Sequence, residues 1–206
     1  MLRRIVTELK EHTPFTAVGA VTGIIIMVIV VFGNVPSGIS HTIFYTLHPV
    51  HVVLSALVTT AMYKKHSNSK IWVAILIGYT GSIGIATISD VIIPYWGAAL
   101  LNINMEFHIP FIEEWWLINP PALIGIAIGY WRPTTKFPHS GHVLLSTWAS
   151  LFYFTAFGIA YWIPLLPFIF LFLFLAVWIP CCLSDIVFPL LFTRKVATSE
   201  HIPYNQ

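Results

Sequence analysis

The chain has 206 residues, of which 57% are hydrophobic and only 9% are charged, and its formal net charge is +2. This composition is typical of integral membrane proteins and excludes an ordinary soluble domain. The small positive charge does not indicate a nucleic-acid partner, and the sequence has neither a glycine-rich phosphate loop nor a basic strip with interspersed aromatic residues. We therefore predict a membrane protein that is surrounded by lipid and does not bind nucleic acid.

Long apolar runs follow one another along the chain, separated by short loops. A helix needs roughly 20 apolar residues to cross a hydrocarbon layer about 30 Å thick, and each run is long enough. The sequence thus predicts an all-α integral membrane protein with six transmembrane helices. The runs are Phe15–Gly33, Thr42–Tyr63, Ile71–Trp96, Phe111–Trp131, His142–Tyr161 and Ile163–Phe192.

Lysine and arginine occur only in alternate loops and near the two ends of the chain. They are Arg3, Arg4, Lys10, Lys64, Lys65, Lys70, Arg132, Lys136, Arg194 and Lys195. By the positive-inside rule, this pattern predicts a multi-pass protein of the cell membrane with both termini in the cytoplasm. Residues 1–14 and 193–206 then form cytoplasmic end segments. Residues 97–110 form an external loop. Glu106, His108, Glu113 and Glu114 form an acidic patch there and just after it, which we interpret as solvated loop charge, with the concentration of cations as the alternative.

Each half of the chain contains a helix with two histidines, followed by a helix that ends in Ser-Asp-x-x-x-Pro. The polar positions of the two histidine helices share offsets of 0, 3, 7 and 11, so they line one face of each helix. They are His48, His51, Ser55 and Thr59 in the first half and His139, His142, Ser146 and Ser150 in the second. The motifs that follow contain Asp90 and Asp185. The sequence predicts two copies of one three-helix unit, at residues 15–96 and 111–192.

A unit of three crossings has an odd number of helices, so the second unit enters the membrane from the opposite side. The predicted fold is therefore a pair of inverted-topology repeats, an arrangement that many secondary transporters use. Two groups of side chains can then meet, one in the outer and one in the inner half of the bilayer. They are His48, His51 and Asp90, and His139, His142 and Asp185. The sequence leaves open whether these groups form two separate sites or approach one another.

An ionised aspartate in hydrocarbon costs at least about 2.5–3.5 kcal/mol, and none of the six runs contains a Lys or Arg to pair with Asp90 or Asp185. Each aspartate is therefore expected to be protonated, paired with histidine or bound to a cation. Imidazole and carboxylate together suit Zn or Fe, and histidines three residues apart present two ligands on one helix face. We predict that all six residues of the two groups are metal ligands. The structural alternative is a pair of Asp–His hydrogen-bond clamps.

Two adjacent prolines, Pro120 and Pro121, lie within the fourth run. Such a pair breaks a membrane helix unless the freed polar groups face protein or water. A discontinuous helix is a usual feature of transport sites, so we expect either such an interruption or a static kink at these prolines. The adjacent Cys181 and Cys182 are instead interpreted as small apolar filler.

These features favour a carrier for a divalent transition metal, in which the two inverted units alternate access to the ion. A membrane-embedded metalloenzyme acting on a lipid or another apolar substrate is the alternative, so enzymatic activity stays open. The predicted cofactor is a Zn or Fe ion, with haem held by histidines of neighbouring helices as a further possibility. A structural subunit, either as a homo-oligomer or within a membrane complex, is the remaining hypothesis.

Overall fold

A computed structural model describes residues 2–67, 70–133, 136–159, 162–182 and 187–192. This part of the chain is almost entirely helical, which confirms the prediction of an all-α protein. Its longer helices are α1 (Leu2–Phe32), α2 (Ser37–His66), α3 (Ile71–Thr87), α4 (Ile93–Leu100), α6 (Trp115–Trp131), α7 (Lys136–Phe157) and α8 (Leu166–Cys182). The shorter elements are the π-helical segment η1 (Ile88–Ile92), α5 (Pro110–Glu113), the 3₁₀ segment η2 (Ile163–Leu165), α9 (Phe188–Leu191) and the paired strands β1 (Asn104–Met105) and β2 (Gly158–Ile159).

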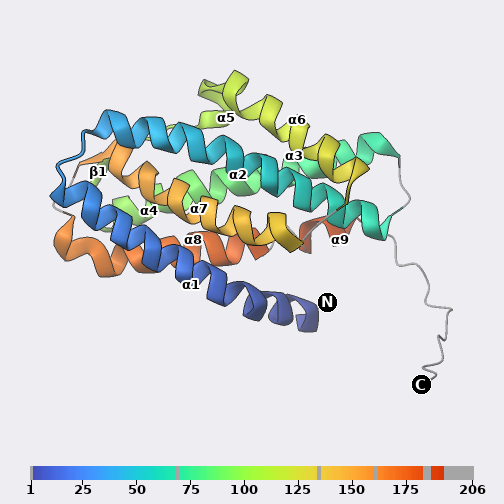
Figure 1. Cartoon of the computed structure of the whole chain (residues 1–206), viewed down its shortest axis with the longest axis horizontal. Coiled ribbons are helices and arrows are strands. Elements are labelled where there is room, and N and C mark those ends of the chain that lie inside the picture. Colours follow the sequence, from blue (N-terminus) through green and yellow to red (C-terminus); the bar gives the residue numbers. More distant parts are fainter. Residues whose placement is uncertain (1, 68–69, 134–135, 160–161, 183–186, 193–206) are drawn as a thin grey trace.

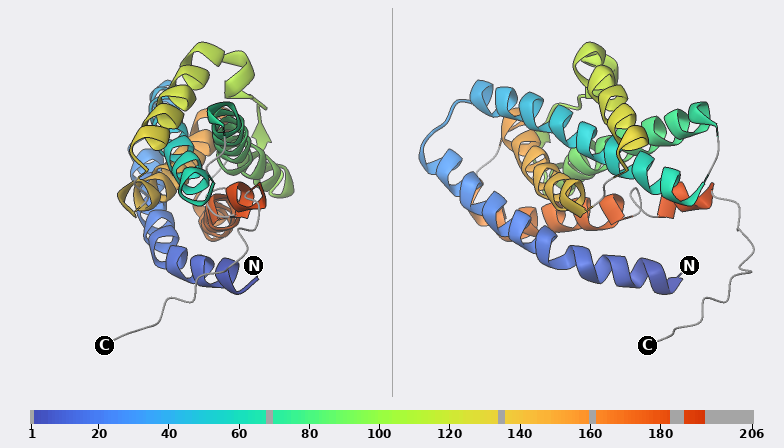
Figure 2. Two further views of the ribbon diagram at one scale, coloured as in Figure 1. Left: turned by 90° about the vertical axis from the view of Figure 1, so that its right-hand side faces the viewer. Right: turned by 45° about the vertical axis from the view of Figure 1, so that its right-hand side comes forward.

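The long helices lie roughly along one axis and form a bundle (Figure 1). Helix α2 packs against α3, α6 and α7, and α7 in turn packs against α1 and α8, so α2 and α7 form the centre. Helix α6 crosses the others at an angle (Figure 2). Residues on the facing sides of α2 and α7 are therefore placed in the interior of the protein.

Two helices end in the same way, with an asparagine in the left-handed backbone region. Asn34 follows α1 with φ of 47°, and Asn102 follows α4 with φ of 54°. In each case the next amide bonds back five residues, at 3.0 Å from Val35 N to Val30 O and at 2.9 Å from Ile103 N to Ala98 O. This is the Schellman arrangement, and asparagine tolerates its positive φ better than most residues do. These caps reverse the chain sharply and keep the loops short.

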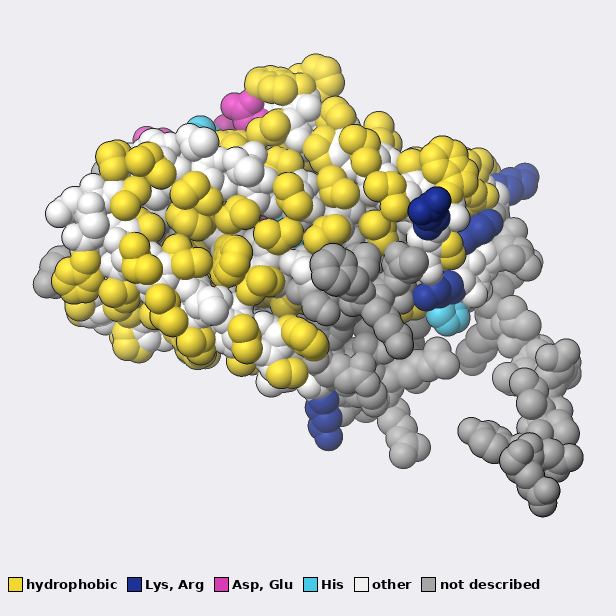
Figure 3. Space-filling view, viewed as in Figure 1, with side chains coloured by type: hydrophobic (Ala, Val, Ile, Leu, Met, Phe, Trp, Pro, Cys, Tyr) yellow, Lys and Arg dark blue, Asp and Glu magenta, His cyan; other side chains and the backbone are white. Residues whose placement is uncertain are grey.

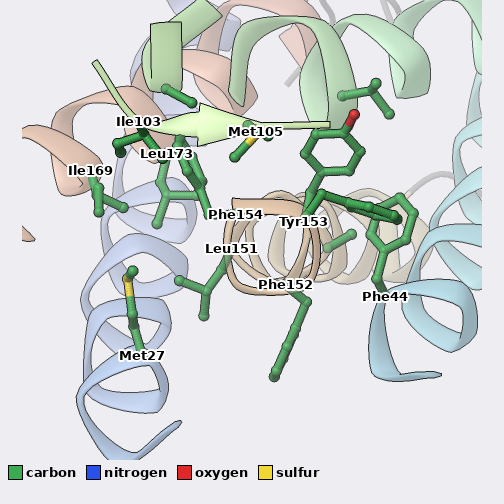
Figure 4. Close-up of a cluster of buried hydrophobic side chains, with 14 residues drawn as sticks. Met27, Phe44, Ile103, Met105, Leu151, Phe152, Tyr153, Phe154, Ile169 and Leu173 are labelled. Carbon is green, nitrogen blue, oxygen red and sulfur yellow. The ribbon is translucent and has the colours of Figure 1, made fainter. Parts of the chain in front are cut away.

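A large apolar cluster fills the bundle beside strand β1 (Figure 4). Tyr153, Phe154 and Phe44 are fully or almost fully buried there. The ring of Phe44 on α2 meets the ring of Tyr153 on α7 edge to face, at 5.4 Å between centroids. The same Phe44 ring stacks on His48 at 5.2 Å and 16°. The cluster therefore fixes α2 against α7 and supports one of the predicted site residues.

Hydrophobic side chains cover most of the visible surface, and Lys and Arg side chains gather at one end (Figure 3). Four helical segments are long and apolar enough to cross a membrane. They are Thr13–Phe32, Ser37–His66, Ile71–Leu100 and Ile163–Cys181. Large apolar residues such as Phe32, Trp72 and Leu100 are more than half exposed, as expected where lipid replaces water. These properties indicate a membrane protein.

The structure differs from the sequence prediction at the fourth run. Helix α6 continues through Pro120 and Pro121, so the predicted break at these prolines is wrong. The interruption lies earlier, at Glu114, whose φ of −113° and ψ of 45° separate α5 from α6. The prolines fall in the second turn of α6, so the carbonyls they leave without a donor lie in the first turn of the helix. At 17 residues, α6 is also shorter than the predicted crossing Phe111–Trp131.

Candidate metal centre

Asp90 is fully buried and lies in η1, where the helix is locally widened. Pro94 has no N–H and cannot donate to the Asp90 carbonyl four residues earlier. The amide of Ile93 bonds instead to Ile88 O, five residues back, which produces the π turn. Single π turns within α-helices are frequent at functional sites. The proline of the Ser-Asp-x-x-x-Pro motif thus helps to shape the backbone that presents the aspartate.

Two histidines from α2 contact one oxygen of this carboxylate. His48 Nδ1 lies 2.8 Å and His51 Nδ1 lies 2.6 Å from Asp90 Oδ2. Both histidines are buried, and their spacing of three residues places them on the same face of α2. The prediction that His48, His51 and Asp90 meet is confirmed, whereas their predicted role as metal ligands stays a prediction.

Hydroxyl groups occupy the other oxygen of the carboxylate. Ser89 Oγ and Ser146 Oγ each donate to Asp90 Oδ1 at 2.7 Å. Ser150 Oγ is 3.5 Å from the same oxygen and makes a shorter bond, 3.0 Å, to the carbonyl of Ser89. Since Ser146 and Ser150 belong to α7, the carboxylate joins the first half of the chain to the second. Sequence reasoning identified these serines as a repeated stripe but did not predict this link.

These distances define hydrogen bonds and not a closed metal cage. Two ligands of a tetrahedral Zn ion with bonds of 2.0–2.1 Å lie about 3.3 Å apart. The N–O separations at Asp90 are 2.8 Å and 2.6 Å. An ionised carboxylate only accepts hydrogen bonds, so both Nδ1 atoms carry their protons here and leave Nε2 with the lone pair. Asp90 therefore orients the two imidazoles, as carboxylates behind metal-binding histidines do.

A second group of potential ligands shares His51 with the first. His142 of α7 and Cys181 of α8 are buried, and one ligand atom from each of His51, His142 and Cys181 lies within 4.8 Å of the others. The His51 and His142 rings are parallel, at 5.7 Å between centroids and 7° between planes. Among the described residues, His51 Nε2 is buried and has no hydrogen-bond partner. The buried His, Asp and Cys side chains could therefore hold a metal ion.

The structure answers one question that the sequence left open. The two predicted groups approach one another, because His142 of the second group lies against His51 of the first. The side chain of His139 and all of Asp185 lie outside the described residues, so their predicted roles stay predictions. Cys181 was interpreted as filler and was missed as a potential ligand. Its spacing of four residues from Asp185 in the sequence was the available signal.

The predicted acidic patch before α6 is organised by Glu113. Its carboxylate accepts a hydrogen bond from the amide of Ile109 at 2.8 Å and contacts His108 Nδ1. These two interactions, the amide first, lower the pKa of Glu113 and outweigh the opposing effect of burial. The amide of His108 donates to Tyr153 Oη at 3.0 Å, which ties the segment to α7. Within the described residues, Glu113 and His108 thus have a clear structural role.

Comparisons of the chain with known protein families, with curated proteins and with solved structures give no significant match. Function must therefore be argued from the residues of this chain.

Proposed function

We propose that this protein is a carrier for divalent transition-metal cations, built from two inverted three-helix units at residues 15–96 and 111–192. The observation that carries the proposal is the contact between His51 and His142. These residues occupy equivalent positions in the two predicted units. If a two-fold axis relates the two units, that axis passes between His51 and His142. Inverted-repeat transporters bind their substrates at such an interface, near the middle of the bilayer.

Two glycine contacts also support the inverted repeat. A Cβ added at Gly19 of α1 would meet Thr147 and Leu144 of α7, and one added at Gly125 of α6 would meet Ala56 and the Val53 carbonyl of α2. Val53 and Ala56 follow His51 by two and five residues, and Leu144 and Thr147 follow His142 by the same numbers. Each unit's first helix therefore packs at the same place on the histidine helix of the other unit.

The remaining helix contacts follow the same relation. The pair α2 and α3 corresponds to α7 and α8, and the pair α1 and α8 corresponds to α6 and α3; all four pairs are in contact. When Ser184-Asp185 is aligned with Ser89-Asp90, Val187 corresponds to Ile92. Val187 is π-helical, as Ile92 is in η1. These correspondences support six crossings, with α6 and α7 added to the four segments that have the required length and apolarity.

A row of buried polar side chains on α2 and α7 supports a route for an ion through the bundle. On α2 it contains His48, His51, Ser55 and Thr59, and on α7 it contains His142, Ser146 and Ser150, all at most 1% exposed. Helix α8 has no polar residue from Phe168 to Trp178, which opposed a continuous path along the third helix of each unit. The facing sides of α2 and α7 supply that path instead. The enclosed site corresponds to the occluded conformation of an alternating-access carrier.

The orientation we propose has both termini in the cytoplasm. The Lys and Arg side chains visible in Figure 3 lie in the right half of the view, the same half in which Figure 1 marks the N-terminus. That distribution agrees with the positive-inside rule. Reporter fusions placed after residue 206 and within residues 101–109 test the orientation. The first should report a cytoplasmic and the second an external location; the same location for both contradicts six crossings.

A structural clamp is the second candidate function, because the four short hydrogen bonds of Asp90 already join α2, η1 and α7 without a metal. A transport assay separates the two candidates. Purified protein in liposomes that contain a zinc-sensitive dye should give saturable Zn²⁺ uptake, and His51→Ala/His142→Ala should abolish it. His66→Ala is the matched control, since His66 is exposed and bonds to the Met62 carbonyl of its own helix. Background uptake by the correctly folded parent contradicts a carrier.

A further inference from the structure

We propose that the ion is held by His51, His142 and Cys181, with Asp90 as a positioning residue, and that the site selects a borderline or soft divalent ion, Zn²⁺ foremost. The assignment of this ion as cargo rests on the proposed transport function. The ligand set itself rests on the geometry of the four buried side chains. It differs from the set predicted from sequence, in which Asp90 was a ligand and Cys181 was not.

The hydrogen bonds decide which atom of His51 faces the ion. Its Nδ1 donates to Asp90 at 2.6 Å, so Nε2 is the atom with a free lone pair. That atom is buried and has no hydrogen-bond partner among the described residues. An unpaired buried imidazole nitrogen is costly, and a metal ion satisfies it. A carboxylate behind the ring fixes the tautomer and increases the basicity of the ligand.

Three helices bring the ligands together. His51 comes from α2, His142 from α7 and Cys181 from α8, and their ligand atoms lie within 4.8 Å of one another. Ligands of a tetrahedral Zn ion lie about 3.3–3.8 Å apart, so the site needs a small inward adjustment to close on the ion. Three protein ligands leave one coordination position open. An open position lets an ion exchange, as a carrier requires.

Charge balance also favours a divalent ion with a thiolate ligand. When the ion binds, Cys181 releases its thiol proton and contributes one negative charge. The carboxylate of Asp90 contributes the second, and the two together neutralise a divalent cation inside the apolar bundle. An uncompensated charge would be expensive there. Sulfur and imidazole ligands favour Zn²⁺ over the hard ions Mg²⁺ and Mn²⁺.

The sulfur ligand breaks the symmetry between the units. When Ser184-Asp185 is aligned with Ser89-Asp90, Cys181 corresponds to Ala86, which is buried but has no ligand atom. A ligand set predicted only from the repeated histidines and aspartates therefore omits the thiolate of Cys181. This explains why the repeat pattern alone did not predict Cys181 as a ligand.

X-ray absorption spectroscopy of Zn-loaded full-length protein tests the ligand set. We expect one sulfur neighbour at about 2.3 Å and nitrogen neighbours at about 2.0–2.1 Å. Cys181→Ser should lose the sulfur shell, and Cys182→Ser, its sequence neighbour, should keep it. Asp90→Asn should keep the sulfur shell but bind Zn²⁺ about 10–100-fold more weakly. Thr80→Ala, at an exposed residue that bonds to the Leu76 carbonyl of its own helix, should leave the Zn²⁺ affinity unchanged.

The outcomes separate this inference from the transport proposal. Zn²⁺ bound through nitrogen and oxygen alone overturns the ligand set and leaves a carrier intact. A sulfur shell that survives in Cys181→Ser but disappears in Cys182→Ser also overturns it. Sulfur ligation without uptake in liposomes supports the ligand set and contradicts the carrier. If Cys181→Ser does not fold, the spectrum of the parent protein decides, because Cys182→Ser shows whether its sulfur comes from the neighbouring cysteine.

Discussion

The imidazole rings of His51 and His142 lie parallel, 5.7 Å apart between centroids, although the two residues are 91 positions apart in the sequence. They hold equivalent places in the two predicted units, and their contact joins the two halves of the chain. The carboxylate of Asp90 is bonded to His51 on one side and to Ser146 on the other. One buried polar network therefore serves both halves of the protein.

Replacing Asp90 with alanine should destabilise the fold strongly. The change leaves His48, His51 and Ser146 without their common acceptor, and removing one partner of a buried charged network costs about 3–5 kcal/mol. The free energy of unfolding in detergent, measured by reversible denaturation, tests this expectation. Thr80→Ala is the control, because Thr80 is exposed and bonds to the Leu76 carbonyl of its own helix. Equal stabilities of the two variants would show that the network contributes nothing.

Replacing Gly125 with alanine should separate α6 from α2. The new Cβ would lie 2.2 Å from the Val53 carbonyl oxygen. Both atoms belong to or are attached to a helix backbone, so neither can move away unless its helix moves. Overpacking of this kind costs about 1–3 kcal/mol, which exceeds the gain of at most about 1 kcal/mol from better helix propensity. Gly84→Ala is the matched control, because nothing lies within 4 Å of its added Cβ. Thermal unfolding should show a lower midpoint for Gly125→Ala, whereas Gly84→Ala should be unchanged or higher.

The segment before α6 should lose local stability in acid. The pKa of Glu113 is lower in the folded protein than in the unfolded chain, because the Ile109 amide and His108 favour its charged form. Its contribution is therefore present at neutral pH and is lost as the pH falls through the folded pKa. Hydrogen-exchange protection of the Ile109 amide, corrected for intrinsic exchange, should decline over that range.

Two variants complete the pH experiment. Glu113→Gln should show low protection of the Ile109 amide at every pH, because the ionised acceptor is gone. Glu106→Gln should keep the parent profile, since Glu106 is 82% exposed and lies 3.6 Å from His108. A decline of the same size in Glu113→Gln would assign the pH dependence to another group.

Zn²⁺ should stabilise the folded protein, by an amount that rises with the logarithm of the Zn²⁺ concentration above Kd. A ligand at about 100 times its Kd adds about 2.7 kcal/mol to the free energy of unfolding when it binds only the native state. The unfolding midpoint should therefore rise on addition of Zn²⁺ and return when a chelator is added. His51→Ala should show no such rise, and Mg²⁺ should not stabilise the parent. An equal rise in His51→Ala would place the bound ion elsewhere.

The sequence predicted the class of the fold because transmembrane helices are specified locally. The length of an apolar run corresponds directly to the thickness of the hydrocarbon layer that it crosses. The spacing of His48 and His51 places both on one helix face, whatever residues they contact. The repeated motifs also paired these histidines correctly with Asp90. The proline pair misled the prediction, because its effect depends on where the helix begins. With α6 starting at Trp115, the carbonyls freed by Pro120 and Pro121 lie in its first turn.

The sequence by itself determined a helical membrane protein with a repeated His and Asp pattern, because hydrophobicity and helical periodicity act over a few turns of one chain segment. Only the tertiary structure decided that His142 lies against His51, that Ser146 donates to Asp90 and that Cys181 joins the two histidines. Those contacts depend on how closely helices far apart in sequence approach, and at Gly125 that approach is set by the absence of a single Cβ.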